Sequence, residues 1–413
     1  MKKNFNSRLA EFRRKLPIGI RLLKERLRMA INSLFQEKKF KRNVFHTDFK
    51  KYALMVTDPT IFKKKQHKKY HTISTEVYTI GSVLRNLGYN VDCTTDGNNS
   101  VKLAKYDVIG PSLSMFERIW KENISATTIR YSPGSHPLFC YRVTANKMMQ
   151  VREAKQSWMP SSTRYLNNDI RTYYADMLAD HIIVLGNEFI LSKYLEEDPR
   201  PERYHRLNAF YFDCHKPDLD AKDFDNTRTH ICWFGSLGLI HKGLDIAIDI
   251  ALNHPEITLH ICGATKREKE FWKYYAPLIK DRPNIIDHGF LLVDSEEFVE
   301  VMNQCAWLIN PSISEGMSTA VLNVCANAGL VPIYTKATGI DLQEYGIELD
   351  DAEYGLFETA VLNAIKTDPE ELRKKSKAVC EHVRQNYTYE QYQNNLLEII
   401  KHCLSSKNNR NNH

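Results

Sequence analysis

The stretch Ala306–Ile333, AWLINPSISEGMSTAVLNVCANAGLVPI, decides the fold. It begins with a short apolar run, Ala306–Asn310, and a proline follows, which is typical of a buried strand that leads into a loop. Ser318 favours the start of a helix, and Gly329 is typical of a helix end. A second apolar run, Leu330–Tyr334, then begins. The stretch therefore predicts a strand, a helix and a second strand, as in a parallel sheet.

The loop before the predicted helix carries groups that suit a phosphorylated sugar. The backbone N–H groups of Gly316, Met317 and Ser318 are expected to point out of the helix N-terminus, which favours anions. Glu315 lies directly before them, and its carboxylate can accept hydrogen bonds from sugar hydroxyl groups. The alternative is a strand–helix pair of a Rossmann-like sheet that binds no ligand.

These residues resemble the donor-sugar motif of the retaining GT-B glycosyltransferases, family 4 (glycosyl transferases group 1). The family motif is a Glu, seven residues, a second Glu and a helix of small residues that ends in glycine. Glu315 matches the first Glu, whereas Asn323 stands in the second place. The second Glu binds the ribose hydroxyls in the family, and an Asn can still form hydrogen bonds there. The resemblance implies two Rossmann-like parallel-sheet domains that face a cleft.

A second motif of the same family lies earlier in the chain, in Ile231–Ala251. A buried strand meets a glycine-rich turn there, and a helix follows Lys242. The resemblance implies that Gly235, Ser236 and Lys242 bind the donor diphosphate. The family has an arginine where Ser236 stands, so one cation is missing. Further along, Gly289-Phe290 resembles the strand tip that lies near the nucleotide base.

The first half of the chain also alternates strand and helix patterns. One helix is expected at Thr75–Leu87, and strands are expected at Tyr52–Thr57, Asn90–Thr94, Asp107–Gly110, Ala126–Arg130 and Ala179–Asn187. The resemblance implies that this half binds the acceptor.

Two side chains of this half are candidates for the active site. His136 lies in the loop Tyr131–Pro137 and is similar to a histidine that touches the donor sugar in the family; the alternative is a structural turn histidine. Arg164 is a candidate cation for phosphate or acceptor binding, and the alternative is an ordinary surface arginine.

The sequence divides into five parts. We predict a basic helical extension at 1–45, an N-terminal Rossmann-like acceptor domain at 46–225, a C-terminal Rossmann-like nucleotide-sugar domain at 226–386, a crossover helix at 387–404 and a disordered tail at 405–413.

The extension concentrates the positive charge. The chain has a formal charge of +7, and its first 42 residues contain 14 basic and 3 acidic residues. An apolar stripe accompanies them, so the segment can lie on an anionic membrane surface. The alternative is a helix packed on the body of the protein. Nucleic acid is not an expected partner, because neither an interleaved aromatic pattern nor a binding motif accompanies the charge.

The sequence predicts a cytoplasmic protein, peripheral to the inner face of the membrane through residues 1–45. No apolar stretch approaches about 18 residues, and no secretory signal is visible. The nine cysteines are scattered without a C-x-x-C pair, which favours a reducing compartment.

A metal cofactor is not expected. Asp218-Leu-Asp220 and Asp223-Phe-Asp225 both spell D-x-D, the metal motif of the GT-A glycosyltransferases. A working D-x-D follows a buried strand, but these lie in a polar stretch before one.

The leading hypothesis is a hexosyltransferase that uses a nucleotide sugar and retains the anomeric configuration, with a glycan or lipid-linked acceptor in surface polysaccharide synthesis. Lys242 and helix-terminal amides would stabilise the leaving diphosphate, and Glu315 would hold the donor sugar. Two alternatives are a sugar-nucleotide epimerase of the same fold and a degenerate, non-catalytic GT-B binding subunit. Ser236 and Asn323 motivate the latter.

Overall fold

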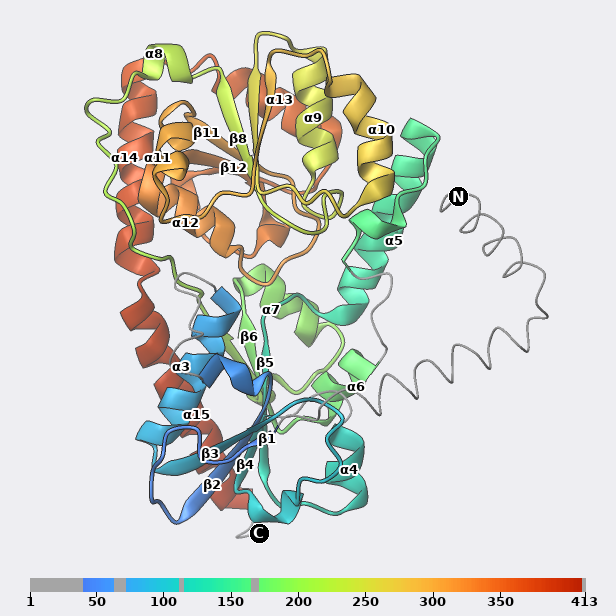
Figure 1. Ribbon diagram of the computed structural model, residues 1–413, viewed down its shortest axis with the longest axis vertical. Helices are drawn as coiled ribbons and strands as arrows, with labels where there is room; N and C mark the ends of the chain where they lie inside the picture. The colour runs from blue at the N-terminus through green and yellow to red at the C-terminus, as the bar shows by residue number, and fades with distance from the viewer. Residues whose placement is uncertain (1–39, 63–71, 111–114, 165–170, 411–413) are drawn as a thin grey trace, which may run out of the picture.

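The computed structural model describes residues 40–62, 72–110, 115–164 and 171–410 (Figure 1). They form two α/β domains, one below the other along the long axis of the molecule. The predicted fold class, two Rossmann-like domains with parallel sheets, is confirmed. The helices predicted for the basic extension lie at 1–39, outside the described residues.

The first sheet has the strand order β1-β3-β2-β4-β5-β6-β7. Its neighbouring strands are parallel except for β1, which is antiparallel to β3. The strands are β1 (Phe40–Lys41), β2 (Lys51–Val56), β3 (Tyr89–Thr94), β4 (Val108–Gly110), β5 (Thr127–Ser132), β6 (His181–Leu185) and β7 (Tyr204–Leu207).

The predicted boundary between extension and first domain needs a correction. β1 belongs to the first sheet, and Val44 is buried with its N–H donating to the carbonyl of Val91. Residues 40–45 are therefore part of the first domain.

The helices of the first domain cover both faces of its sheet. They are α3 (Thr72–Asn86), α4 (Met115–Lys121), α5 (Pro137–Lys155), α6 (Arg171–Leu178) and α7 (Glu188–Leu195), with 3-10 turns η1 (Pro59–Phe62), η2 (Leu103–Lys105), η3 (Pro160–Ser162) and η4 (Pro201–Arg203). The long helix α5 was not predicted. It runs up beside the second domain, where Lys147 pairs with Asp245 at 3.0 Å and Lys155 with Asp249 at 2.5 Å (Figure 1).

The second sheet has the order β10-β9-β8-β11-β12-β13 and is parallel throughout. Its strands are β8 (His230–Phe234), β9 (Thr258–Cys262), β10 (Ile285–Gly289), β11 (Trp307–Asn310), β12 (Val331–Thr335) and β13 (Ile347–Leu349). Its helices are α8 (Phe224–Thr227), α9 (Leu244–Asn253), α10 (Lys269–Ile279), α11 (Glu296–Asn303), α12 (Thr319–Ala328) and α13 (Tyr354–Ala364), with 3-10 turns η5 (Lys336–Thr338) and η6 (Gln343–Tyr345).

Two helices join the domains along one side of the molecule (Figure 1). Helix α14 (Pro369–Asn386) packs on α12, and α15 (Tyr389–Arg410) returns to the first domain, against α3 and β7. The helix continues past Leu404 to Arg410, so part of the segment that we expected to be disordered is helical. Among the described residues, no helix combines the length and apolarity that a bilayer crossing requires.

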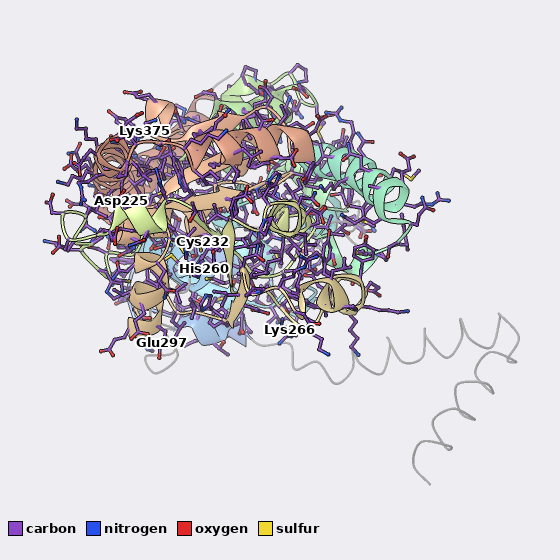
Figure 2. The ribbon with its side chains drawn as sticks, turned by 90° about the horizontal axis from the view of Figure 1, so that it is seen from above. Asp225, Cys232, His260, Lys266, Glu297 and Lys375 are labelled. Carbon is purple, nitrogen blue, oxygen red and sulfur yellow. The ribbon has the colours of Figure 1, made fainter. Side chains whose placement is uncertain are left out.

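The core of the second domain is close-packed between sheet and helices. Seen from above, Cys232 on β8 lies in the interior, whereas the charged side chains of Lys266, Glu297 and Lys375 lie at the periphery (Figure 2). The central strands β8, β11 and β12 are buried on both faces, as expected for a parallel sheet covered by helices.

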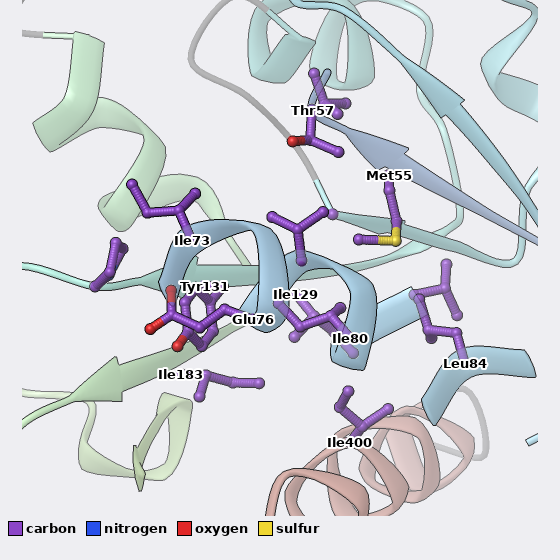
Figure 3. A pocket seen from close by; sticks show the side chains of 15 residues that line it. Met55, Thr57, Ile73, Glu76, Ile80, Leu84, Ile129, Tyr131, Ile183 and Ile400 are labelled. Carbon is purple, nitrogen blue, oxygen red and sulfur yellow. The ribbon is translucent and has the colours of Figure 1, made fainter. Parts of the chain in front are cut away.

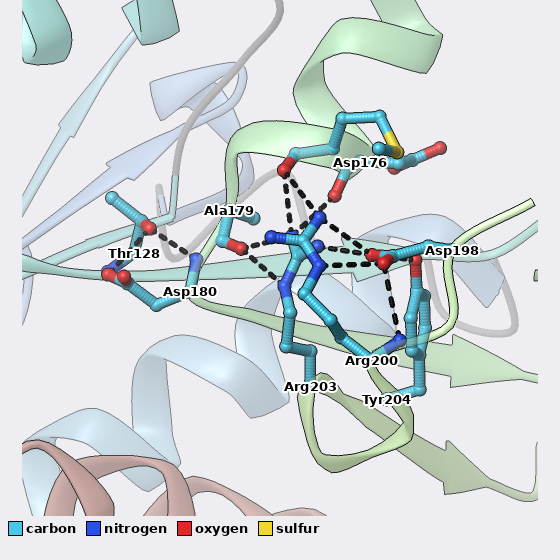
Figure 4. Close-up of polar contacts among 9 residues, drawn as sticks. Thr128, Asp176, Ala179, Asp180, Asp198, Arg200, Arg203 and Tyr204 are labelled. Atoms are coloured by element: carbon cyan, nitrogen blue, oxygen red, sulfur yellow. Dashed lines mark hydrogen bonds and ion pairs between the residues drawn. The ribbon is translucent and has the colours of Figure 1, made fainter. Parts of the chain in front are cut away.

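A buried ionic network closes the end of α6 in the first domain (Figure 4). The guanidinium group of Arg203 donates to the carbonyl oxygens of Asp176 at 2.8 Å, Met177 at 3.1 Å and Ala179 at 3.1 Å. These carbonyls have no partner within the helix, so the cation satisfies them. Arg203 also pairs with the buried Asp198.

Two further groups hold the Asp198 carboxylate, namely Arg200 at 2.7 Å and the hydroxyl of Tyr204 at 2.9 Å. Burial alone would raise the pKa of Asp198, but these hydrogen bonds and Arg203 together lower it. The carboxylate is therefore ionised and its charge is compensated.

We predict that Arg203→Met destabilises the protein by about 3–5 kcal/mol, because it leaves a buried carboxylate and several carbonyls without a donor. Arg200→Met is the matched control, since the Arg200 side chain is 47% exposed and its loss should cost less than about 1 kcal/mol. Urea unfolding at one pH measures both. Equal losses in the two variants would contradict a special role for Arg203.

Candidate active site

The site lies where the strand order of the second sheet reverses. β8 and β11 are neighbours, but the chain continues from β8 toward β9 and from β11 toward β12 on the opposite side. Ligands of α/β sheets bind outside the carboxyl ends of strands at such a point. The loops 235–243 and 311–318 follow these two strands, and they carry Lys242 and Glu315.

The structure brings three of the predicted side chains into direct contact. One carboxylate oxygen of Glu315, Oε1, pairs with Nζ of Lys242 and accepts a hydrogen bond from Ser312 at 3.1 Å. The other, Oε2, pairs with Nη1 of Arg164 at 3.0 Å. Arg164 follows η3 in the first half of the chain, so the carboxylate links residues from both halves.

Electrostatics keep Glu315 ionised despite its burial. Only 8% of the residue is exposed, and burial by itself would raise the pKa of Glu315. Lys242 and Arg164 outweigh that effect and hold the pKa of the carboxyl well below its usual value. The neighbouring His241 is fully buried, which lowers its pKa to about 3, and its Nε2 bonds to the carbonyl of Ser314. His241 is therefore neutral.

The backbone before helix α9 requires glycine after Lys242. Gly243 has φ +68°, and a Cβ there would lie 2.4 Å from the carbonyl oxygen of Pro311. The turn after β8 thus packs directly on the turn after β11. This contact places Lys242 beside Glu315.

The loop Tyr131–Pro137 of the first domain presses against the Glu315 loop. The hydroxyl of Ser135 donates to the carbonyl of Glu315 at 2.6 Å. A Cβ on Gly316 would lie 2.2 Å from the carbonyl oxygen of Pro133, so only glycine fits. Gly316 is needed for this close approach between the domains.

His136 sits in the same loop and is the N-cap residue of α5. It is 1% exposed, and burial lowers its pKa to about 4. Its ring lies edge-on to Tyr173 and Tyr194, and no partner within the described part of the chain reaches its buried Nδ1. A buried polar atom without a partner is unusual and is consistent with a ligand contact.

The amides expected at the start of α12 are partly occupied. The N–H of Ser318 donates to the carbonyl of Thr338 at 3.1 Å, so this amide does not point to a ligand, contrary to our prediction. The buried Ser318 hydroxyl, in contrast, has no hydrogen-bond partner among the described residues. The Met317 sulfur accepts from the N–H of Ala209 at 3.0 Å.

The loop after β8 is capped by a residue that the sequence analysis did not identify. The buried carboxylate of Glu268 accepts the N–H groups of Gly238 at 2.6 Å and Leu239 at 2.9 Å. Nothing in the sequence around Glu268 distinguishes it from a surface glutamate. Gly235 donates to the carbonyl of Cys262 at 3.0 Å, and Ser236 is exposed.

Apolar side chains stand exposed at the same end of the sheet. Phe290, which follows Gly289 at the tip of β10, is 72% exposed, Leu292 is 53% exposed and Leu237 is 50% exposed. Gly289 has φ +68°, and its N–H donates to Asp287 at 3.0 Å. These apolar side chains lie in the loops that follow β8 and β10.

No protein-family model and no curated protein matches this chain. Solved structures do match. Sucrose-phosphate synthase (tll1590) from Thermosynechococcus elongatus aligns with a TM-score of 0.61 at 12% identity, covering 86% of this chain and 100% of the other. Anabaena Alr3699/HepE in complex with UDP and glucose aligns with a TM-score of 0.56 at 13% identity, with the same coverages. S. aureus TarM aligns with a TM-score of 0.50 at 12% identity, covering 72% of this chain and 54% of TarM.

The chain has the GT-B fold. In this fold the two sheets face each other with the carboxyl ends of their strands, and the loops named above lie between them. The predicted relation of this chain to GT-B proteins is confirmed at the level of the fold.

Asn323 is engaged with the linker between the GT-B domains. Its Oδ1 accepts the N–H of Phe212 at 2.8 Å, and its Nδ2 donates to the carbonyl of Thr319 at 2.7 Å. Asn327, one turn later, accepts the N–H groups of Cys214 and His215 and donates to the carbonyl of Phe212. Both polar atoms of Asn323 are thus occupied by backbone, in contrast to the ribose contact that the resemblance implied.

The two D-x-D sequences also lie in the linker, and three of their carboxylates have structural partners. Asp218 accepts the N–H of Ala221 at 3.0 Å. Asp223 caps helix α8 by accepting the N–H of Asn226 at 3.1 Å. Asp220 pairs with Lys377 on α14 at 2.5 Å. These contacts hold the linker against the second domain.

A buried carboxylate in the first domain was not predicted. Glu76 on α3 is 3% exposed, and burial raises its pKa to about 7, although a hydrogen bond with Tyr131 opposes the shift. The hydroxyl of Tyr131 lies 3.2 Å from that of Tyr392 on α15. The burial depends on α15, which follows more than 300 residues later, so local sequence could not reveal it.

We predict a pH-dependent effect of Glu76→Gln on stability. The folded pKa of about 7 exceeds the reference value of 4.5, so the folded protein binds the proton more tightly. The stabilising contribution is complete below about pH 4.5 and is lost as the pH rises through 7. Glu76→Gln has no carboxyl group to ionise, so it does not lose this stability as the pH rises. The free energy of unfolding of the variant minus that of the wild type should therefore increase by on the order of 3 kcal/mol between pH 5 and pH 8.

Urea unfolding at both pH values measures this difference, and Glu300→Gln on the exposed side of α11 is the matched control. The control should show no comparable change. If the difference in stability between Glu76→Gln and the wild type is the same at pH 5 and pH 8, the Glu76 carboxyl group does not have the raised pKa that its burial implies.

Proposed function

We propose that the protein is a glycosyltransferase that moves a hexose-type sugar from a nucleotide sugar to a glycan or lipid-linked acceptor, with retention of the anomeric configuration. The observation that carries this proposal is the cluster of Lys242, Arg164 and Glu315 at the switch point of the second sheet. The Glu315 carboxylate is buried, whereas the Arg164 side chain is 40% exposed. Two cations beside a carboxylate suit a ligand with both phosphate and hydroxyl groups. The neighbour Alr3699/HepE, a protein of the same fold, was solved with UDP and glucose, which supports a nucleotide-sugar donor.

In the proposed reaction, Lys242 changes its partner from the Glu315 carboxylate to the donor diphosphate. The charge on the diphosphate increases as the bond to the sugar breaks, so a fixed ammonium group stabilises the transition state more than the ground state. Arg164 is the second available cation near the leaving group, and it stands in for the arginine that Ser236 replaces. Glu315, relieved of one cation, accepts hydrogen bonds from donor-sugar hydroxyl groups.

His136 acts as a neutral hydrogen-bonding group in this mechanism. Its lowered pKa of about 4 keeps the imidazole uncharged at neutral pH. Its buried Nδ1, for which the described residues provide no partner, can bond to a sugar hydroxyl. The acceptor hydroxyl attacks on the same face as the leaving group and passes its proton to the departing phosphate oxygen.

We propose that donor binding needs no divalent cation. Asp220 and Asp223 are held by Lys377 and by the start of α8, away from Lys242. The described residues contain one group of side chains with metal-ligand spacing, His181, His205 and Cys403. This group lies where β6 and β7 begin, whereas the proposed site lies beyond the carboxyl ends of the strands.

Two alternatives are retained because of specific observations. A sugar-nucleotide epimerase would use the same donor site, and NMR of a nucleotide sugar without acceptor would reveal the epimer. A non-catalytic binding subunit is favoured by the exposed Ser236 and by the linker contacts of Asn323. Such a subunit would bind nucleotide or partner without turnover.

Lys242→Ala and Glu315→Ala should fail in different ways. Lys242→Ala should lower kcat/KM by about 10–100-fold and weaken binding of the nucleoside diphosphate, because a charged hydrogen bond is worth roughly 1.5–3 kcal/mol. Glu315→Ala should impair sugar transfer but leave nucleoside diphosphate binding unchanged or tighter, since it releases two cations. Lys375→Ala, on the exposed side of α14, is the control for charge removal.

Calorimetry with UDP, GDP and ADP, together with kinetics on the corresponding sugars, separates the two effects. The titrations are made in EDTA and repeated with Mn²⁺, and we expect no difference. A strict Mn²⁺ requirement would contradict metal-free donor binding. Loss of nucleotide affinity in Glu315→Ala to the extent seen in Lys242→Ala would contradict the sugar contact. Unaltered turnover in both variants would refute the enzymatic proposal.

We also propose that residues 1–45 hold the enzyme on the inner face of the cytoplasmic membrane, where an acceptor for surface polysaccharide is presented. The basic excess in this segment supports it, since each basic residue near an anionic surface contributes about 1 kcal/mol. The full chain should float with anionic vesicles at low salt, and a chain that begins at residue 40 should not. Equal flotation of the two would leave the segment as a helix packed on the body.

A further inference from the structure

An apolar cavity of about 250 Å³ lies in the first domain, between α3, the sheet and α15 (Figure 3). Aliphatic side chains such as Met55, Ile80 and Ile400 form most of its lining. Its described lining contains no Lys, Arg or His. The cavity therefore suits a hydrocarbon group and not a phosphate.

The cavity lies at the switch point of the first sheet. β2 and β4 are neighbours, and the chain continues from β2 to β3 on one side and from β4 to β5 on the other. Thr57 follows β2, Gly110 ends β4, and both line the cavity. This is the place where an open α/β sheet binds ligands.

Two contacts connect the cavity to the proposed donor site. Pro133 lines the cavity, and its carbonyl oxygen makes the close approach to Gly316, next to Glu315. Ile73 also lines it, and the hydroxyl of the preceding Thr72 lies 3.4 Å from that of Thr319, the first residue of α12. A ligand in the cavity would thus extend toward the donor sugar.

One carboxyl group lies in this apolar lining. Figure 3 shows the Glu76 carboxyl group beside the Tyr131 ring, under the first turn of α3. The groups that face Glu76 are the hydroxyls of Tyr131 and Tyr392, both uncharged at neutral pH because burial raises their pKa values. A carboxyl group at that point can accept a hydrogen bond from a ligand hydroxyl and disfavours an anion.

We propose that this cavity binds a saturated hydrocarbon portion of the acceptor and that Glu76 binds an acceptor hydroxyl group. The inference rests on the proposed glycosyl transfer for its biological meaning, but the site can be tested by itself. An apolar cavity of about 150 Å³ holds benzene, so this one holds a group of roughly ten carbon atoms. Glu76 is then the residue that selects an alcohol over an acid.

The test uses 1-octanol and octanoate as probes, which have the same chain and differ at the polar end. Calorimetry with the full chain at pH 8 should show saturable 1-octanol binding and at least tenfold weaker octanoate binding. In Glu76→Gln the difference between the probes should shrink at least fivefold, because the repulsion between carboxylates is removed. An unchanged difference in Glu76→Gln would overturn the role of Glu76.

Two filled-cavity variants, Val77→Phe and Ile80→Trp, should lower 1-octanol affinity at least tenfold. Ile119→Phe on α4 is the matched control, since Ile119 is a partly buried apolar residue of the same domain that does not line the cavity. Circular dichroism and urea unfolding check that each variant is folded. Absence of saturable 1-octanol binding in the wild type, or unchanged binding in both folded variants, would overturn the site.

These outcomes are independent of the proposed reaction. One outcome is that the protein binds octanol, that the cavity variants abolish this binding, and that the protein binds no nucleotide. This outcome would support the cavity and refute glycosyl transfer. Nucleotide binding and turnover in a protein that binds no octanol would support glycosyl transfer and refute the cavity.

Discussion

The contact between the Glu315 loop and the loop Tyr131–Pro137 is the constraint on which the site depends. Gly316 and Pro133 approach so closely that no side chain fits between them, and Ser135 donates to the Glu315 carbonyl. The backbone of one domain therefore fixes the position of the Glu315 carboxylate in the other. Lys242 and Arg164 then offset the desolvation of that carboxylate, and the carboxylate in turn keeps two long cationic side chains in one place. Two cations are therefore already gathered around one anion at the switch point of the second sheet.

The two sheets share one topological feature, a switch point in their strand order. Each reverses its strand order once, and the loops at each reversal converge on the space between the domains. The second sheet places cations and a carboxylate there, whereas the first places an apolar cavity with one carboxyl group. The two domains thus differ in the groups at their switch points, while α5, through Lys147 and Asp245, holds the domains together.

The sequence predicted what local patterns determine. Helix α12 and its flanking strands follow from two apolar runs, from Ser318 at the N-cap position and from the αL glycine Gly329. The resemblance to the family assigned both Lys242 and Glu315 to the donor site. Helix α5 was missed because its buried face includes Thr144 and Lys147, which break the apolar stripe; the partner of Lys147 lies in the other domain. In the sequence, Glu76 and Glu268 look like ordinary surface residues. Their burial could not be predicted because it comes from elements that are distant in the chain. Tertiary contacts of this kind have no local signal.

Asn323 shows why a departure from a family motif needs the structure for its interpretation. The side chain accepts one backbone hydrogen bond through its oxygen and donates another through its nitrogen, whereas an ionised carboxylate can only accept. A glutamate there could accept from Phe212 but would face the Thr319 carbonyl with a second acceptor. With Asn327 using its amide in the same way, the pair fastens the linker Phe212–His215 to α12. The linker contact thus occupies the side chain to which the family resemblance assigned a ribose contact. A substitution that looks in the sequence like a lost ligand contact therefore serves in the structure to fasten the linker between the two domains.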